Sequence, residues 1–197
     1  LGMIIDIAHA SDETFFDVLK CSKSPIVSTH SCCRALAHHR RNMSDEMLRA
    51  LADKGGVIQI NFYPVFLSDA FAKTLADSGL ESKSWTEQDW ISDPLNPEKA
   101  AAWNAVQDEM AALPRPSYKD VVDHIDHAVK VAGMDSVGIG SDFDGIEVTP
   151  VGLENVSKIR VIFDEMSRRG YTEDQIEKVA GRNFLRVFNE VSEQAAK

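Results

Sequence analysis

Two histidines and one aspartate stand where three short apolar runs end. His9 closes the run at residues 2–8, His30 closes the run at 25–29, and Asp142 follows the run at 136–140. Neutral imidazole suits Zn²⁺, and a carboxylate beside a metal can take a proton from water. A catalytic zinc usually has three protein ligands, so two histidines need a carboxylate from elsewhere. We predict that His9 and His30 bind metal and that Asp142 is catalytic.

Each of these side chains also has a simpler interpretation. A single histidine at a strand end is more often a core residue whose hydrogen bonds are satisfied, and Asp142 or Asp144 could cap the turn. The shared position of His9 and His30 on consecutive runs favours the metal site. We predict that Asp144 caps the turn and that Asp142 takes part in catalysis.

Other histidines receive no metal-binding role. His124 and His127 have H-x-x-H spacing, but on a helix His127 points away from the apolar face, so we predict that it is exposed to solvent. His124 borders that face. His38 and His39 lie in a polar loop.

Arginines follow the loop after the second apolar run. A guanidinium near the strand ends, from Arg40 or Arg41, can hold a substrate carboxylate in a bidentate pair. Taken alone, Arg40-Arg41 also fits a solvated surface.

Four apolar runs can position these side chains. The runs at 2–8, 25–29, 56–62 and 136–140 are short, and most are rich in Val and Ile, as buried parallel strands are. Helix-like segments follow them, with start signals at Ser11, Ser44, Ser117 and Thr172. Alternating strands and helices predict a parallel α/β sheet, with active-site residues at the strand C-termini of a (β/α)8 barrel. Four units predict the C-terminal half of such a TIM-like barrel.

Residues 64–117 separate the last two predicted strands. The segment holds five prolines, and Asn96-Pro97 begins a helix that we expect to reach about residue 113. A connection this long is usually functional or structured. We predict an insertion or lid within one domain of residues 1–197, with a passive cover over the barrel end as the equal alternative.

Composition narrows the classes of function. The 31 acidic and 21 basic residues give a net charge of −10, which repels phosphate backbones and argues against nucleic acid. No apolar run approaches the ~20 residues that span a bilayer. Three cysteines in no disulfide-like pattern slightly favour the cytoplasm over the periplasm. The abrupt apolar start at Leu1 and the open edges of a half barrel suggest a part of a longer protein.

Seven segments together resemble the renal (membrane) dipeptidase family, zinc-dependent metallodipeptidases of the amidohydrolase-type superfamily. The matches run nearly end to end and keep their order, which makes them far more specific than any single string. They are Asp6-Ile7-Ala8-His9-Ala10-Ser11, Ser28-Thr29-His30-Ser31, Arg40-Arg41-Asn42, Gly56–Tyr63, Gly140-Ser141-Asp142-Phe143-Asp144-Gly145, Gly152–Val156 and Asn183–Phe188.

The resemblance implies dipeptide hydrolysis with two zinc ions, often tolerating a D-residue at the C-terminal position. His9 and His30 would bind the second zinc. Asp142 would contact the water between the metals and assist proton transfer, and Arg41 would grip the dipeptide's C-terminal carboxylate.

The family's H-x-D pair, its bridging glutamate and a histidine that steadies the oxyanion have no counterpart here. We therefore expect this chain alone to supply one incomplete metal site and to be inactive, with activity belonging to a longer protein that adds the N-terminal half. Two alternatives stay open: another amidohydrolase, such as a deacetylase or a phosphotriesterase-like enzyme, and an inactive half barrel that pairs with a partner or as a homodimer.

Overall fold

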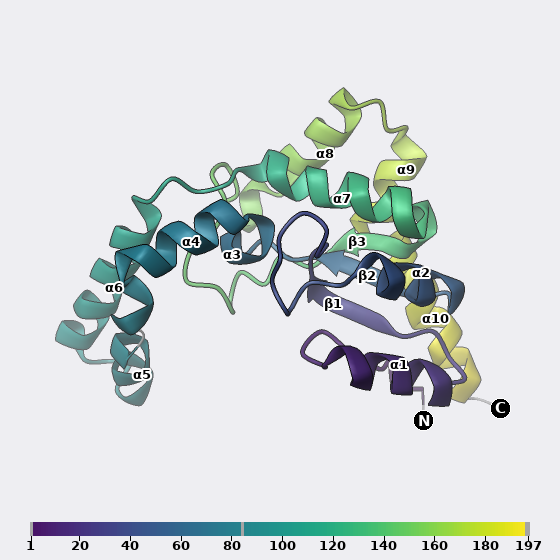
Figure 1. Cartoon of the computed structure of the whole chain (residues 1–197), viewed down its shortest axis with the longest axis horizontal. Coiled ribbons are helices and arrows are strands. Elements are labelled where there is room, and N and C mark those ends of the chain that lie inside the picture. The colour runs from purple at the N-terminus through teal and green to yellow at the C-terminus, as the bar shows by residue number, and fades with distance from the viewer. Residues whose placement is uncertain (1, 84, 196–197) are drawn as a thin grey trace.

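The chain folds around a small parallel sheet with helices packed against it. The computed structural model describes residues 2–83 and 85–195 (Figure 1). The strands β1 (Val27–Ser31), β2 (Val57–Ile60) and β3 (Val137–Ile139) are parallel and lie in the order β1-β2-β3. The predicted α/β fold with a parallel sheet is confirmed.

The run at residues 2–8 is not a regular strand, contrary to the sequence prediction. It makes one isolated parallel bridge, between Asp6 and Val27. The Asp6 carboxylate accepts the backbone N–H groups of Ala8 and Thr29, at 3.0 and 3.1 Å. Of these two, the Thr29 N–H is the one that a continuing ladder with this run would use. The bridge still aligns this segment with β1, so His9 follows the same edge of the sheet as His30.

Three helices begin at the serines that the sequence marked. Ser11, Ser44 and Ser117 cap α1 (Asp12–Cys21), α2 (Asp45–Asp53) and α7 (Tyr118–Ala132), each through its side-chain oxygen. The capping box of Ser117 with Asp120 is present. These caps satisfy backbone N–H groups at each helix start and fix where each helix leaves its loop.

The two faces of β2 have different neighbours. Ile58 and Ile60 belong to the main core, together with residues of α2 and α7. Val57 points to the opposite face, where it packs with Val187 and Val191 of α10 (Asn183–Ala195). Because side chains alternate along a strand, Gln59 and Asn61 fall on the Val57 side, beyond the part that α10 covers.

The segment at 64–117 has helical structure of its own. It forms α3 (Pro64–Leu67), α4 (Asp69–Ser78), α5 (Trp85–Ser92) and α6 (Pro97–Ala111), and α5 and α6 lie at the end of the molecule farthest from the sheet (Figure 1). Asn96 caps α6, which confirms the predicted helix there. Phe71, Leu75 and Trp103 are buried in the same cluster as the strands, so the segment extends the main core.

The C-terminal region contains a break that the sequence did not predict. After α8 (Arg160–Arg168), Thr172 opens α9 (Glu173–Glu177), but a π-type turn at Lys178–Arg182 separates α9 from α10. Gly181 is extended within this turn. The break places the Asn183 amide to donate to the backbone oxygens of Met134 and Val137, at 2.7 and 2.8 Å. The C-terminal helix is thereby fastened to β3.

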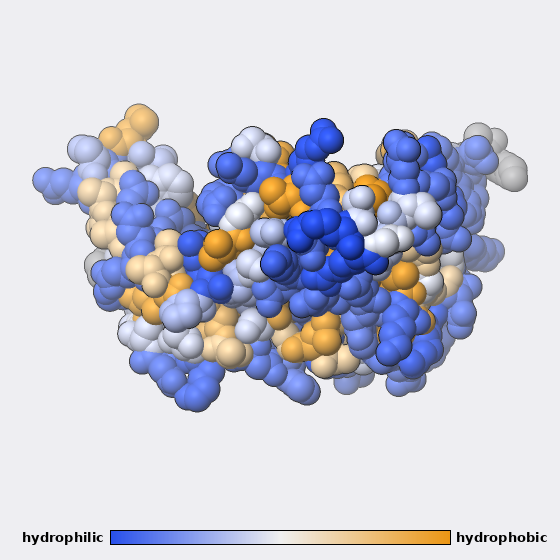
Figure 2. Space-filling view, turned by 90° about the horizontal axis from the view of Figure 1, so that it is seen from above, coloured by the Kyte–Doolittle hydropathy of each residue, from blue (hydrophilic) through white to orange (hydrophobic). Residues whose placement is uncertain are grey.

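Polar and apolar side chains are interspersed over the surface. Figure 2 shows hydrophilic residues scattered among smaller hydrophobic areas on the face that it presents. Within residues 2–83 and 85–195, no helix is both long and apolar enough to cross a bilayer.

Candidate active site

The structure brings His9 and His30 side by side. Their Nε2 atoms are 2.9 Å apart, and the ring centroids are separated by 5.0 Å with the planes tilted by 57°. His30 lies in β1, and His9 follows the bridge that joins residues 5–7 to that strand. The two histidines, 21 positions apart in sequence, therefore direct their Nε2 atoms into the same space.

This spacing fits a shared metal ion. Two nitrogens held at about 2.05 Å from a tetrahedral zinc would be about 3.3 Å apart, so the rings need to open by only about 0.4 Å. No group of three or more His, Cys, Asp or Glu residues within the described part of the chain could hold a metal. The pair is a two-ligand set, and a catalytic site built on it needs further ligands.

A hydroxyl and a carboxylate stand behind His30. Thr29 Oγ1 is 2.8 Å from His30 Nδ1 and donates to Asp6 Oδ2 at 2.6 Å. Because the hydroxyl donates to the carboxylate, it accepts the proton of Nδ1–H. This arrangement leaves the Nε2 lone pair of a neutral His30 directed toward His9, as a metal ligand requires. Neither Asp6 nor Thr29 was predicted as a site residue, although both lie within the segments that resemble the family.

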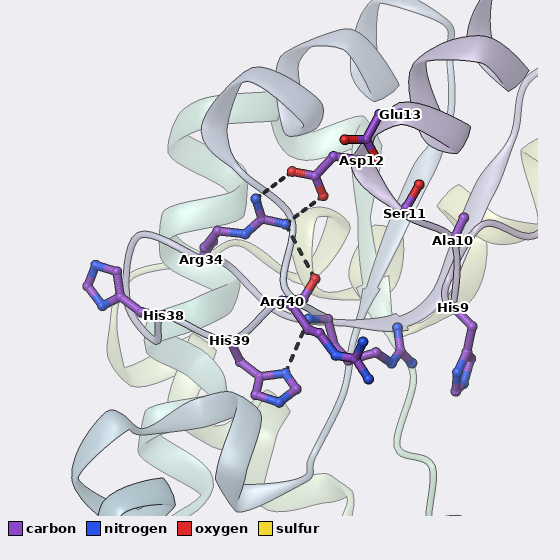
Figure 3. A pocket seen from close by; sticks show the side chains of 10 residues that line it. His9, Ala10, Ser11, Asp12, Glu13, Arg34, His38, His39 and Arg40 are labelled. Carbon is purple, nitrogen blue, oxygen red and sulfur yellow. Dashed lines mark hydrogen bonds and ion pairs between the residues drawn. The ribbon is translucent and has the colours of Figure 1, made fainter.

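Arg41 lies in the pocket that His9 borders, on the side formed by the loop after β1. His9, on one side of this pocket, faces the loop that carries His38, His39 and Arg40 (Figure 3). The guanidinium of Arg41 lies 5.6 Å from the centre of the Phe66 ring, a cation–π contact. Desolvation lowers the pKa of Arg41, and the negative charges of Asp142 and Asp6 oppose that shift.

A second arginine in the pocket is already paired. Arg34 donates to both carboxylate oxygens of Asp12, at 2.6 and 2.8 Å (Figure 3). This bidentate pair lowers the pKa of Asp12 and neutralises the Arg34 charge. Arg41 is therefore the better placed of the two to bind an incoming carboxylate.

Asp142 follows β3 in an unusual backbone conformation. Its φ of 63° is left-handed, and it is the one residue other than glycine with positive φ among those described. The Asn61 amide donates to Asp142 Oδ2 at 2.9 Å. Asn61 was not among the predicted site residues.

The predicted site residues share one electrostatic environment. Desolvation, Arg41 and His30 lower the pKa of His9, whereas Asp142 and Asp6 raise it. His9, His30 and Asp142 lie at or just beyond the C-terminal ends of parallel segments of the sheet, and Arg41 lines the pocket that His9 borders.

The histidines outside this group have other partners. His127 was predicted to be exposed, which is wrong: its side chain is only 19% exposed, because Nε2 contacts Asp45 Oδ1 at 2.7 Å. His38 contacts Asp69 at 2.7 Å. His124 is buried against Cys33 and Leu67. None of these rings contributes to the His9–His30 pair.

Comparison with known proteins adds a family match over the whole chain. The model of the membrane dipeptidases, peptidase family M19, matches residues 1–197. An uncharacterized dipeptidase of Schizosaccharomyces pombe is 36% identical over 189 residues, covering 95% of this chain. The crystal structure of the probable dipeptidase PvdM from Pseudomonas aeruginosa superposes with a TM-score of 0.76 and 33% identity over 98% of this chain.

A more distant structure shares the fold. A metallo peptidase from Rhodobacter sphaeroides, liganded with a phosphinate mimic of the dipeptide L-Ala-D-Ala, has a TM-score of 0.71 at 23% identity, and the match covers 96% of this chain and 43% of that one. The present chain spans 36% of the yeast relative and 51% of PvdM. It therefore corresponds to about a third to a half of these proteins.

Proposed function

Because this chain belongs to the membrane dipeptidase family, peptidase family M19, we propose that the protein containing it hydrolyses dipeptides with a zinc-dependent site. The observation that carries the proposal is the convergence of His9 Nε2 and His30 Nε2, 2.9 Å apart, beside Arg41. The two imidazole nitrogens fit a metal ion, and the Arg41 guanidinium fits the free carboxylate that every dipeptide carries.

We propose two zinc ions in the full-length enzyme, of which His9 and His30 hold one. The second ion and the remaining ligands belong to residues that this chain does not supply. Bound zinc supplies Lewis acidity, which polarises a carbonyl group and lowers the pKa of a water molecule. The Thr29 hydroxyl and the Asp6 carboxylate support His30 as a ligand by holding its proton on Nδ1.

Arg41 and Asp142 take separate tasks in this proposal. Arg41 pairs with the C-terminal carboxylate of the dipeptide and fixes where the scissile bond lies. Asp142 takes a proton from the attacking water and returns it to the leaving amine. The pocket that His9 and Arg41 share, and the position of Asp142 just after β3, support placing both groups at the metal-binding edge.

We also propose that residues 1–197 form one domain, the C-terminal half of a (β/α)8 barrel. The order of residues 5–7, β1, β2 and β3, each parallel to the next, supports this. So does the match to about half of PvdM. The helices of 64–117 are the insertion between the last two strands, and we propose that they act as a lid or an edge cover.

On this proposal, the chain alone is inactive because its metal site is incomplete. The N-terminal half of the barrel is its necessary partner and brings the other ligands. The three free thiols, Cys21, Cys32 and Cys33, favour a reducing compartment such as the cytoplasm.

Two other functions stay as alternatives. Strand-end histidines alone also fit a deacetylase or a phosphotriesterase-like amidohydrolase. A catalytically inactive half barrel, paired with itself or with a partner, would keep the same residues without turnover. Arg41 beside the metal-binding edge argues against a phosphotriesterase, because a phosphotriester has no carboxylate for a guanidinium to bind. An N-acetyl amino acid does carry a carboxylate, so the choice between a deacetylase and a dipeptidase depends on the assay.

Assays on the natural full-length protein test the proposal. Zinc-loaded protein is given L,L- and L,D-dipeptides, an N-acetyl amino acid and a phosphotriester. Cleavage of dipeptides that is lost with a chelator and regained with zinc is expected, and the isolated chain of residues 1–197 should give none. Preferential cleavage of either non-peptide substrate, or none of any substrate by the metal-loaded protein, would reject it.

A further inference from the structure

The Asp142 carboxylate is held by a side chain from a different strand segment. Asn61, one residue beyond the end of β2, donates from Nδ2 to Asp142 Oδ2 at 2.9 Å, across 81 positions of sequence. Asn61 is buried, with no exposed surface. A buried amide must be hydrogen-bonded, and here it uses its donor on the candidate catalytic carboxylate.

The orientation of the Asn61 amide is set by the backbone. Its Oδ1 accepts the N–H of Tyr63 at 2.6 Å. A backbone N–H can only donate, so the oxygen must face Tyr63 and the NH₂ must face Asp142. Asn61 is thus a fixed donor, and the carboxylate has one fixed acceptor position on Oδ2.

The other oxygen of Asp142 lies where a neighbouring residue has no side chain. A Cβ at Gly145 would stand 2.4 Å from Asp142 Oδ1. The Asp142 backbone is left-handed, a strained conformation for a residue with a side chain, and the Gly145 N–H closes the turn on the Asp142 carbonyl at 2.9 Å. The turn therefore holds the carboxylate at a cost to the backbone, and it requires glycine at position 145 because a side chain there would clash with Oδ1.

We propose that Asn61 is a positioning residue that fixes Asp142 Oδ2 and so leaves Oδ1 as the oxygen that moves the proton; this inference rests on the proposed hydrolase function. In the reaction, Oδ1 accepts a proton from the water whose oxygen bonds to the peptide carbonyl carbon. It returns that proton to the amine nitrogen as the C–N bond breaks. Asn61 itself touches no substrate in this account.

Asn61→Asp separates the two hydrogen bonds of the asparagine. The substitution keeps an oxygen to accept the Tyr63 N–H but replaces the donor with a carboxylate oxygen 2.9 Å from Asp142. The matched control is Gln59→Glu, the same amide-to-acid change on β2. Gln59 Nε2 donates to the backbone oxygen of Ile139 at 3.2 Å, not to Asp142.

The full-length zinc protein is measured as wild type, Asn61→Asp, Asp142→Asn, the double variant and Gln59→Glu. Asn61→Asp should lower kcat by about 10²-fold, the scale of a lost acid–base group, with KM and zinc content nearly unchanged. It should also lower Tm, because two like charges meet. The double variant exchanges acid and amide, so it should regain most of the lost Tm but none of the lost kcat.

Three results would overturn the inference. They are a kcat for Asn61→Asp within twofold of wild type, an equal loss of kcat in Gln59→Glu, and a double variant whose Tm shows no coupling. If the wild-type zinc protein cleaves no dipeptide, the proposed function fails instead. The Tm cycle needs no turnover and still decides whether Asn61 and Asp142 are coupled.

Discussion

The His9–His30 pair and His124 use the same type of side chain in opposite ways. At the sheet edge, His9 and His30 direct Nε2 atoms at each other, 2.9 Å apart. Behind the loop after β1, His124 spends both ring nitrogens on backbone: Nδ1 accepts the Cys33 N–H at 3.0 Å, and Nε2 faces the Leu67 oxygen at 3.2 Å. A ring whose nitrogens are committed to backbone joins elements together, whereas rings that share a space can hold a ligand.

The His9–His30 pair and His124 also differ in burial and in the charges around them. His124 is 1% exposed, and burial lowers its pKa to about 4, so it is neutral at physiological pH. Its proton lies on Nε2, because Nδ1 accepts a hydrogen bond. His9 of the His9–His30 pair lines a pocket, and the charges of Arg41, Asp142 and Asp6 act on its ring. Loss of the His9–His30 pair should therefore impair catalysis, whereas loss of His124 should lower stability.

The largest expected effect is that of His30→Ala on catalysis. In the full-length protein, we expect kcat/KM to fall by about 10³-fold or more, because a metal contributes several kcal/mol to transition-state stabilisation. Elemental analysis should show loss of zinc, with a small change in Tm. His124→Gln is the contrasting variant, and it should keep its zinc. Equal zinc loss in both variants would remove the distinction between the two groups.

The next effect is that of His124→Ala on folding. Removing the ring leaves the buried Cys33 N–H and Leu67 oxygen without their partner and opens a cavity between α7 and the loops that it joins. We expect the free energy of unfolding to fall by about 3 kcal/mol, measured by urea titration. The control His38→Ala, at an exposed ring bound to Asp69, should change it by less than about 0.5 kcal/mol.

The lowered pKa of His124 predicts a pH dependence of stability. The unfolded chain takes up a proton near pH 6.5, while the folded chain resists until about pH 4. Stability is complete above pH 6.5 and is lost as the pH falls from there to about 4, by about 3 kcal/mol in total. In urea titrations over this range, the free energy of unfolding of wild type should fall relative to that of His124→Gln as the pH is lowered. Parallel curves would show that His124 is not the group responsible.

Smaller effects should test Arg41 as the group that binds the substrate carboxylate. Arg41→Lys keeps the charge but loses the bidentate fork, and we expect KM for dipeptides to rise about tenfold with a smaller change in kcat. Phe66→Leu removes the ring under the guanidinium and should raise KM about two- to fivefold, as a cation–π contact is worth ~0.5–1 kcal/mol. A change in kcat alone would argue against carboxylate binding by Arg41.

The sequence predicted the parallel sheet and the meeting of His9 with His30 for one physical reason. Parallel strands end at a common edge, so side chains that follow consecutive apolar runs come together without any knowledge of the loops. Local signals were equally reliable at Ser11, Ser44 and Ser117, where a cap acts within its own helix turn.

The predictions that failed depended on contacts between residues far apart in sequence. His127 points away from the apolar stripe of its own helix, but Asp45 at the start of α2 reaches it, 82 positions away in sequence. Asn61 reads as an ordinary strand residue until Asp142 approaches it. The ladder of the first run ends where the Asp6 carboxylate accepts the backbone N–H of Thr29 in β1. Each outcome depends on a partner that no local pattern names.

Anomalous scattering at the zinc edge, from crystals of the zinc-loaded full-length protein, tests the central claim most directly. The account predicts a zinc peak at about 2.0–2.1 Å from both His9 Nε2 and His30 Nε2. A zinc-loaded crystal without a peak at that position, and with the two rings still hydrogen-bonded to each other, would contradict it.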